Sequence, residues 1–294
     1  MPTAFLFAGG GSLGAVQVGM LKALASNGVQ ADLVVGASVG AVNAAYFATD
    51  PTAEGVARLE AIWRRIQRRE VFPAPTVRGV MRLIRGRSHL LEADGLRRML
   101  EREFAVRDFA GLTLPCTVVA TDLLDGLPVH IQSGPLVPAL LASTSIPGVF
   151  PPVTLGSRVL VDGGLATGSP LAAAIALGAT RLLVLPTGYS CARRTPPTSA
   201  AGVALQGLNI LTVGKLIATI REYRARVTID VVPPLCPLDV SPVDFAQTAA
   251  LIERAEQSTA RWLAQGGDLV DGFPHQLPVH GHTDPTAPYA AHLV

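Results

Sequence analysis

Cysteine is scarce in this sequence, and its three positions form no pattern. Cys116, Cys191 and Cys236 are odd in number and share no spacing typical of metal ligands. This favours free thiols in a reducing compartment over a disulfide framework. No cluster of His, Cys, Asp or Glu residues has metal-ligand spacing either. We therefore expect no bound metal ion and no cofactor.

Aromatic residues and net charge are also low. Aromatics make up 5% of the chain, the net charge is +2, and no motif that reads RNA or DNA is present. A nucleic-acid partner is therefore not expected. Only 16% of residues are charged and 49% are hydrophobic, which permits a sizeable core. The length of 294 residues fits one large α/β domain or two small ones.

Long uninterrupted hydrophobic runs are missing, although the mean hydropathy is +0.39. The longest stretch without Asp, Glu, Lys or Arg, 127–157, contains six prolines. A second uncharged stretch, 163–180, is interrupted by Gly168 and Pro170. We expect no transmembrane helix. The N-terminus lacks a basic region before its short apolar run, so we expect no signal peptide and a cytoplasmic location.

Three short motifs stand out against this background, each after an apolar run typical of a strand. They are Gly9-Gly10-Gly11-Ser12-Leu13-Gly14, Gly36-Ala37-Ser38-Val39-Gly40 and Asp162-Gly163-Gly164. Together they supply what acyl transfer through a serine needs: backbone donors for an oxyanion, a nucleophile on a sharp turn, and a carboxylate to take its proton.

The surrounding pattern predicts an α/β fold. A strand–helix–strand–helix start is typical of a parallel sheet with crossover helices. We expect a hairpin across Asp125-Gly126, and a loop or disordered tail over 265–294, which is rich in Gly, Pro and His. The expected strands are 3–8, 33–35, 116–121, 127–131, 158–161, 182–185 and 228–232. The expected helices are 15–26, 39–49, 53–69, 95–103, 136–142, 170–177, 210–226 and 244–263.

The glycine loop at Gly9–Gly14 has three interpretations. Its spacing fits a dinucleotide fingerprint, but that motif needs an acid at the end of the second strand, and the nearby Asp32 precedes that strand. It could be a structural turn. The preferred interpretation is an oxyanion hole beside Ser38, because backbone N–H groups at a helix start favour negative charge.

No histidine is well placed to act as the base. His275, His280, His282 and His292 lie in the tail, His89 lies in an arginine-rich segment, and His130 lies in an expected core strand without a motif. An α/β-hydrolase would place its serine after more strands than precede Ser38. Asp162 is the better candidate, although Asp-Gly-Gly alone is more often a tight turn.

These residues resemble the patatin-like phospholipases, a family that includes neuropathy-target-esterase-type lysophospholipases. The resemblance covers roughly 4–263 and includes VVATDLLDG (Val118–Gly126), ASTSIPGVFPPV (Ala142–Val153) and VDGG (161–164). It implies a three-layer α/β/α sandwich with a mainly parallel sheet, in a single domain over 1–264. It also implies that Ser38 is the nucleophile and Asp162 the base, that Gly9, Gly10 and Gly11 line the oxyanion hole, and that the dyad needs no metal. Leu13 departs from the family, which commonly has a basic residue there.

The function predicted on these grounds is a serine-dependent acyl hydrolase acting on lipid esters through an acyl-enzyme. An acyltransferase or thioesterase would use the same dyad, and a catalytically silent lipid-binding module would keep the same fold. A malonyl-type transferase shares the early serine but needs a histidine partner. The sequence does not define the oligomeric state.

An arginine-rich helical insert is expected at about 53–107. Between Arg58 and Arg107 there are thirteen arginines and six acids, a local excess of +7. Two interpretations stay open. The helix that carries Arg64, Arg65, Arg68 and Arg69 could lie on an anionic membrane surface with its apolar side inward. Alternatively, its apolar side packs on the core and the arginines are solvated.

Overall fold

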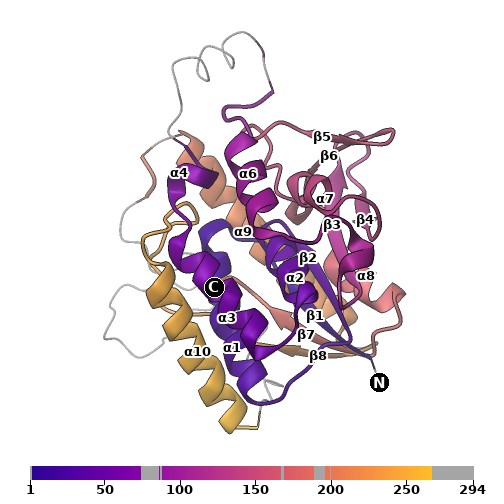
Figure 1. The fold of residues 1–294 in the computed structure, drawn as a ribbon, viewed down its shortest axis with the longest axis vertical. Helices are drawn as coiled ribbons and strands as arrows, with labels where there is room; N and C mark the ends of the chain where they lie inside the picture. Colours follow the sequence, from indigo (N-terminus) through magenta and orange to yellow (C-terminus); the bar gives the residue numbers. More distant parts are fainter. Residues whose placement is uncertain are drawn as a thin grey trace, which may run out of the picture.

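A computed structural model describes residues 2–73, 86, 88–166, 169–188, 196–198 and 200–266. Its centre is an eight-stranded sheet in the order β5-β6-β3-β2-β1-β7-β8, with β4 paired to β3 (Figure 1). The strands are β1 Thr3–Phe7, β2 Leu33–Ala37, β3 Cys116–Asp122, β4 Pro128–Ile131, β5 Val153–Leu155, β6 Arg158–Asp162, β7 Arg181–Leu185 and β8 Thr228–Val231.

The sheet is mixed, with its parallel part at the start of the chain. Strands β3, β2, β1, β7 and β8 are parallel neighbours, whereas β4, β5 and β6 pair antiparallel. The predicted hairpin is present, because β3 and β4 pair from Val118–Ile131 to Thr121–Pro128. The predicted α/β class with parallel strands is confirmed.

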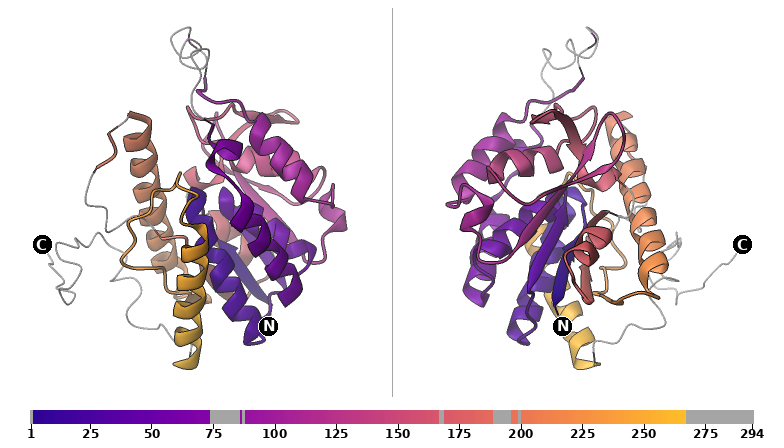
Figure 2. Two further views of the ribbon diagram at one scale, coloured as in Figure 1. Left: turned by 60° about the vertical axis from the view of Figure 1, so that its left-hand side comes forward. Right: turned by 90° about the vertical axis from the view of Figure 1, so that its right-hand side faces the viewer.

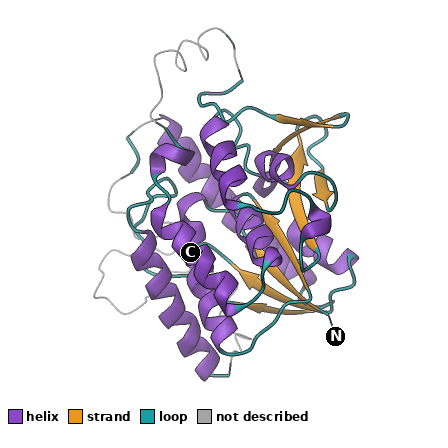
Figure 3. Cartoon of the chain, viewed as in Figure 1, coloured by secondary structure: helices purple, strands orange, loops and turns teal. Residues whose placement is uncertain are grey.

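Helices cover both faces of the sheet (Figures 1 and 3). They are α1 Ala15–Ser26, α2 Val39–Thr49, α3 Ala53–Arg65, α4 Arg68–Val71, α6 Asp94–Glu103, α7 Leu136–Ser143, α8 Ser169–Ala176, α9 Ala200–Tyr223 and α10 Thr248–Ala264. Short 3₁₀ turns follow three of the loops: η1 Gly11–Gly14, η2 Phe109–Gly111 and η3 Gly163–Leu165.

Two hydrophobic clusters define the three layers. Alternate residues of a strand point to opposite faces. Accordingly, Phe5 and Phe7 of β1 pack with α1, α2 and α10, whereas Ala4 and Leu6 pack with α8 and α9. In Figure 2 (right) the sheet lies between the indigo and purple helices on one side and the orange α9 on the other. The sandwich expected from the family resemblance is therefore confirmed.

Several boundaries differ from the sequence-based expectation for local reasons. The helix expected over 53–69 is two helices, because Ile66 is extended and Gln67 begins α4 with a capping box to Glu70. Helix α10 begins at Thr248 rather than 244, since Asp244 accepts a hydrogen bond from Ala246 N–H in a turn. Strand β5 was not expected, because three residues are too few to show alternation.

Helix α9 corrects the expectation about long apolar helices. It begins ten residues earlier than the predicted 210–226, and within it Gly202–Tyr223 is long and apolar enough, by length and composition alone, to cross a membrane. Core helices of soluble proteins pass the same test. On its inner side, Ile217 and Ile220 pack into the second hydrophobic cluster. On its outer side, Val203, Ile210 and Leu211 are exposed.

Some predictions fall outside the described residues. These are the tail from residue 267, its four histidines, Cys191, and residues 74–85 and 87 of the insert. Of the other two cysteines, Cys116 is buried and Cys236 is exposed. Within the described ranges, no group of three or more His, Cys, Asp or Glu residues is arranged to hold a metal ion.

Candidate active site

Ser38 stands on a strained turn between β2 and α2. Its φ of 56° makes it the one non-glycine residue with positive φ among those described, a conformation that costs free energy and recurs at functional sites. The flanking glycines permit the turn. A Cβ at Gly40 would lie 2.2 Å from the Phe7 carbonyl oxygen, and one at Gly36 would lie 2.4 Å from the Gly40 carbonyl oxygen. This is the geometry of a nucleophile elbow.

Strand register brings Asp162 to Ser38. Strand β2 pairs with β3 up to Ala37 opposite Val119, and β6 pairs with β3 from Asp162 opposite Ala120. Because β4 occupies the other side of β3 at these residues, β6 continues on the side where β2 stops. The carboxyl ends of β2 and β6 therefore meet, and the residue after Ala37 is Ser38.

The side chains of Ser38 and Asp162 form a short hydrogen bond. Ser38 Oγ donates to Asp162 Oδ2 at 2.6 Å, and Gly164 N–H donates to Asp162 Oδ1 at 2.8 Å. Asp162 is only 4% exposed. Burial raises the pKa of its carboxyl group to about 6, against the lowering effect of these two hydrogen bonds. The carboxylate is thus a stronger base than an exposed aspartate.

Three further residues hold the pair in place, and the motif search did not single them out. Ser143 Oγ accepts a hydrogen bond from Ser38 N–H at 2.9 Å and donates to the Val119 carbonyl. Thr121 Oγ1 donates to the Asp162 carbonyl at 2.8 Å, and the Ser145 carbonyl accepts from Asp162 N–H at 3.0 Å. All three lie in the longer segments that carry the family resemblance, and that resemblance could have pointed to them.

The glycine loop lies against Ser38. A Cβ at Gly9 would lie 3.0 Å from Ser38 Cβ, and one at Gly10 would lie 2.2 Å from Thr187 Oγ1. Gly11 has φ +58°, and a Cβ there would meet the Pro242 carbonyl oxygen at 2.3 Å. In the described part of the chain, the N–H groups of Gly9, Gly10 and Gly11 donate to no protein acceptor. They are therefore available to an anion.

The other motif glycines allow close packing. A Cβ at Gly14 would lie 2.7 Å from Val39 Cγ2, and one at Gly163 would lie 2.0 Å from the Val119 carbonyl oxygen. Gly164 is less crowded and contributes its N–H to Asp162. Leu13, where the family commonly has a basic residue, is fully buried in the core.

A buried polar network fixes both ends of the glycine loop. Gln17 Nε2 donates to the carbonyls of Ala8 and Leu185 at 2.8 and 2.9 Å. Asn43 Nδ2 donates to the Gly14 carbonyl and to Gln17 Oε1, at 3.0 and 2.8 Å. Trp63 Nε1 in turn donates to Asn43 Oδ1 at 2.9 Å. The sequence did not predict this network, because single polar residues within helices form no recognisable motif.

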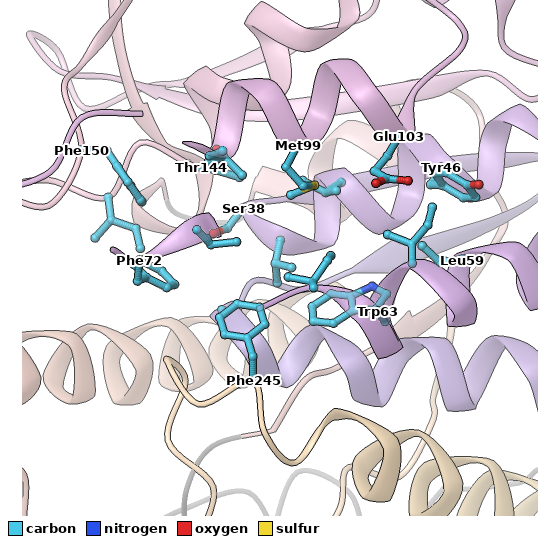
Figure 4. A pocket seen from close by; sticks show the side chains of 18 residues that line it. Ser38, Tyr46, Leu59, Trp63, Phe72, Met99, Glu103, Thr144, Phe150 and Phe245 are labelled. Atoms are coloured by element: carbon cyan, nitrogen blue, oxygen red, sulfur yellow. The ribbon is translucent and has the colours of Figure 1, made fainter. Parts of the chain in front are cut away.

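Two cavities of different chemistry meet at Ser38. The larger one, about 710 Å³, lies between α2, α3 and α6 and is lined almost entirely by apolar side chains (Figure 4). The smaller one, about 490 Å³, combines the three loop glycines, Asp162 and Gly164 with apolar side chains, including Leu205 and Leu208 of α9. It also contains Asn209, which is 7% exposed and whose Oδ1 has no hydrogen-bond partner among the described residues.

The two histidines that the structure describes lie away from the serine–aspartate pair. His130 was expected in a core strand, but it is exposed because β4 is half-buried along its length. His89 lies beside Ser88 and Glu92 in the insert. Neither residue lines the two cavities at Ser38.

The arginine-rich helices face inward with their apolar sides. Ile62, Trp63 and Ile66 are buried and line the larger cavity. The polar side of α3 carries ion pairs instead of a free charged surface, because Arg64 binds Glu60 and Glu253. Of the two interpretations left open by the sequence, packing on the core is the one that the structure has.

The site is therefore a serine–carboxylate pair at the start of a helix, beside free backbone N–H groups and an apolar cavity. A family model described as patatin-like phospholipase matches residues 5–175, more than half of the chain. This chain belongs to the patatin-like phospholipase family. Family membership supports a lipid acyl hydrolase in general.

Curated relatives share only part of their length with this chain. An uncharacterised NTE family protein of Mycobacterium tuberculosis is 32% identical over 169 residues, which are 55% of this chain and 42% of that protein. Patatin-like phospholipase domain-containing protein 6 of Homo sapiens is 28% identical over 188 residues, which are 63% of this chain and 13% of that protein. The chain thus spans less than half the length of either relative.

Solved structures with a similar course of the chain include phospholipases. Human GIVD cytosolic phospholipase A2 in complex with methyl γ-linolenyl fluorophosphonate is 12% identical, with a TM-score of 0.47, and covers 90% of this chain and 58% of its own. VipD from Legionella pneumophila is 12% identical, with a TM-score of 0.44, and covers 90% of this chain and 67% of its own.

Proposed function

We propose that this protein is a serine-dependent lipid acyl hydrolase in which Ser38 and Asp162 form a catalytic dyad. The observation that carries the proposal is the 2.6 Å hydrogen bond from Ser38 Oγ to a buried carboxylate, where an apolar cavity meets a second cavity that contains the glycine loop. A nucleophile in contact with its base needs no histidine between them.

The reaction proceeds through an acyl-enzyme. Ser38 Oγ attacks the ester carbonyl carbon while its proton passes to Asp162 Oδ2, giving a tetrahedral oxyanion. The free N–H groups of Gly9, Gly10 and Gly11 stabilise that charge. The C–O bond to the alcohol then breaks and the alcohol takes the proton from Asp162. Water, deprotonated by Asp162, attacks the acyl-enzyme and releases the carboxylic acid and Ser38.

The electrostatics of Asp162 suit this role. Burial raises its pKa to about 6, so the group is ionised at neutral pH yet close enough to it to accept and return a proton. Thr121, Ser143 and Ser145 act as positioning residues, because they bind only the backbones of the dyad residues.

The two cavities bind different parts of the substrate. The acyl chain enters the apolar cavity, where burial of methylene groups is favourable. The alcohol enters the smaller cavity, where the unpaired Asn209 Oδ1 accepts a hydrogen bond from one of its hydroxyl groups. Peripheral contact with an anionic membrane stays a prediction, which α3 does not support because its apolar side is buried.

Other uses of the same dyad are separated by experiment. Labelling with a fluorophosphonate, followed by profiling of phospholipid, lysophospholipid and acylglycerol substrates, tests the proposal. Wild type should react covalently and Ser38→Ala should not, and the wild type should release fatty acid. No reaction in the folded wild type would indicate a silent lipid-binding module. Acyl transfer to an added alcohol that outcompetes water would indicate an acyltransferase.

A further inference from the structure

The larger cavity extends in one direction along α2. Val39, Val42 and Tyr46 lie at spacings of three and four residues, which places them on one face of the helix. Leu59 and Trp63 of α3 and Leu96 and Met99 of α6 form the opposite walls. Figure 4 shows Ser38 between an aromatic end with Phe72 and Phe150 and a distant end with Tyr46 and Glu103.

The aromatic end is filled by its own contacts. The rings of Phe72 and Phe150 stack at 5.6 Å between centroids, and Phe72 also packs against Phe245 at 6.3 Å. Phe245 in turn stacks on Trp63 at 6.2 Å. These rings occupy their end of the cavity. The cavity continues along α2, where aliphatic side chains border it.

The distant end is closed by polar groups. The side chain of Glu103 is only 6% exposed, and its carboxylate pairs with Arg65 and with Arg102. Tyr46 lies beside it, held edge-on against Phe104 with a centroid distance of 5.6 Å and an interplanar angle of 71°. An apolar wall therefore ends at a buried carboxylate, whose two arginine partners are 54% and 51% exposed.

We propose that the substrate acyl chain lies along α2 and that Tyr46 and Glu103 set its greatest length, which makes medium-chain acyl groups the preferred substrates. This rests on the proposed function, since it assumes an acyl ester at Ser38. With a rise of about 1.5 Å per residue, Tyr46 stands about 10 Å along the helix from Val39. An extended chain with C–C bonds of about 1.52 Å advances about 1.25 Å per carbon, so about eight carbons fit.

The physical reason for a limit is the change in environment at the end of the cavity. Up to that point each added methylene leaves water for apolar surroundings, which should raise kcat/KM by about fourfold. A longer chain would press its methyl group on the buried Glu103 carboxylate, where it gains no further apolar contact and competes with the polar partners of that charge. Alternatively, it must displace Tyr46.

The test is kcat/KM on a series of nitrophenyl esters from acetate to palmitate. For the wild type, we expect a rise to about eight carbons and a fall beyond it. Met99→Trp fills the cavity and should lower octanoate turnover at least tenfold while butyrate stays within threefold. Tyr46→Ala should raise the ratio of dodecanoate to octanoate at least tenfold. Leu124→Trp, at a side chain that is 83% exposed, is the matched control and should leave the profile unchanged.

The outcomes separate this proposal from the proposed function. Leu59→Phe serves as a second filling variant if thermal melting shows that Met99→Trp is unfolded. A wild-type profile that rises through palmitate, or filling variants that lower all esters equally, would overturn the length limit while leaving the hydrolase intact. Absence of turnover for every ester, acetate included, would instead overturn the proposed function.

Discussion

The two sides of Ser38 are built from different parts of the chain. On one side, side chains of α2, α3 and α6 form an apolar wall. On the other side, the backbone of the glycine loop and the polar groups of Asp162 and Asn209 lie among apolar side chains, including Leu205 and Leu208 of α9. Side-chain burial is non-directional, whereas hydrogen bonds are directional. The apolar side is therefore suited to bind the acyl chain, and the side with the glycine loop is suited to position and stabilise the oxyanion.

The difference also explains the state of the base. Asp162 lies at the junction, where the core removes water from its carboxyl group and raises its pKa. The hydrogen bonds from Ser38 and Gly164 prevent a larger rise. A fully polar site would leave a weaker base, and a fully apolar site would leave a carboxyl group that is protonated at neutral pH.

The largest effect is expected from loss of the dyad, which should abolish hydrolysis whatever acyl group or alcohol the ester contains. Ser38→Ala and Asp162→Asn should each lower kcat/KM by roughly 10³-fold or more, and the double variant should be little worse, because the two residues act as one unit. Steady-state kinetics with a nitrophenyl ester measure this, with circular dichroism to verify folding. Near-normal turnover by Asp162→Asn would remove the dyad.

The glycine loop should come next. Gly10→Ala places a methyl group against Thr187, so the loop must move and its N–H groups lose their alignment. We expect kcat to fall by about 10²-fold, as for loss of one oxyanion donor, with a smaller change in KM. Gly207→Ala on α9, where a Cβ meets nothing within 4 Å, is the matched control. Equal activity of the two variants would argue against an oxyanion hole in this loop.

The pH dependence of kcat/KM should reflect the raised pKa of Asp162. Because burial raises the pKa of Asp162 to about 6, kcat/KM should be flat above that pH and should fall about tenfold for each unit below it. A pH profile between 4.5 and 8.5, with melting curves at each pH, tests this. A midpoint near 4 in a folded protein would show that Asp162 is not desolvated in the working enzyme.

A smaller effect is expected on the polar side alone. Asn209→Leu removes the unpaired carbonyl oxygen that faces the smaller cavity. One neutral hydrogen bond corresponds to roughly 1 kcal/mol, so turnover of a monoacylglycerol should fall about fivefold. The nitrophenyl ester of the same acid, whose leaving group lacks that hydroxyl, is the internal control. A parallel loss with both substrates would assign Asn209 a purely structural role.

The smallest effects should come from groups outside both cavities. His130 is exposed on β4, so His130→Gln should leave kcat/KM within about twofold. A chelator should likewise leave turnover of a soluble ester unchanged. Loss of activity in a folded His130→Gln variant, or its restoration by a divalent ion after chelation, would require a different catalytic machinery.

Sequence reasoning predicted the parts that depend on neighbouring residues. The bounds of α1 and α2 agree with the expected 15–26 and 39–49. Helix α1 begins just after the glycine loop, and α2 begins just after Ser38. The proximity of Ser38 and Asp162 was inferred from motif chemistry. Its cause, the register of β2 and β6 on β3, is not visible in any local pattern.

What depends on tertiary packing was missed or left open. The amphipathic pattern of α3 is equally compatible with a lipid surface and with a core, and contact with α1 and α10 decided for the core. Helix α9 shows the reverse, since its largely apolar sequence leaves Ile210 and Leu211 exposed. The network through Gln17, Asn43 and Trp63 joins residues on three helices, which spacing alone does not connect.

The central claim is that Ser38 carries the acyl group, and trapping the acyl-enzyme tests it most directly. Wild type would be mixed with nitrophenyl octanoate at neutral pH, where Asp162 is ionised and can accept the Ser38 proton, then quenched with acid within the first turnover and digested for mass spectrometry. The account predicts an octanoyl group on Ser38, formed with a burst of nitrophenol equal to the enzyme concentration. Turnover without any burst and with the octanoyl group on another residue would contradict it.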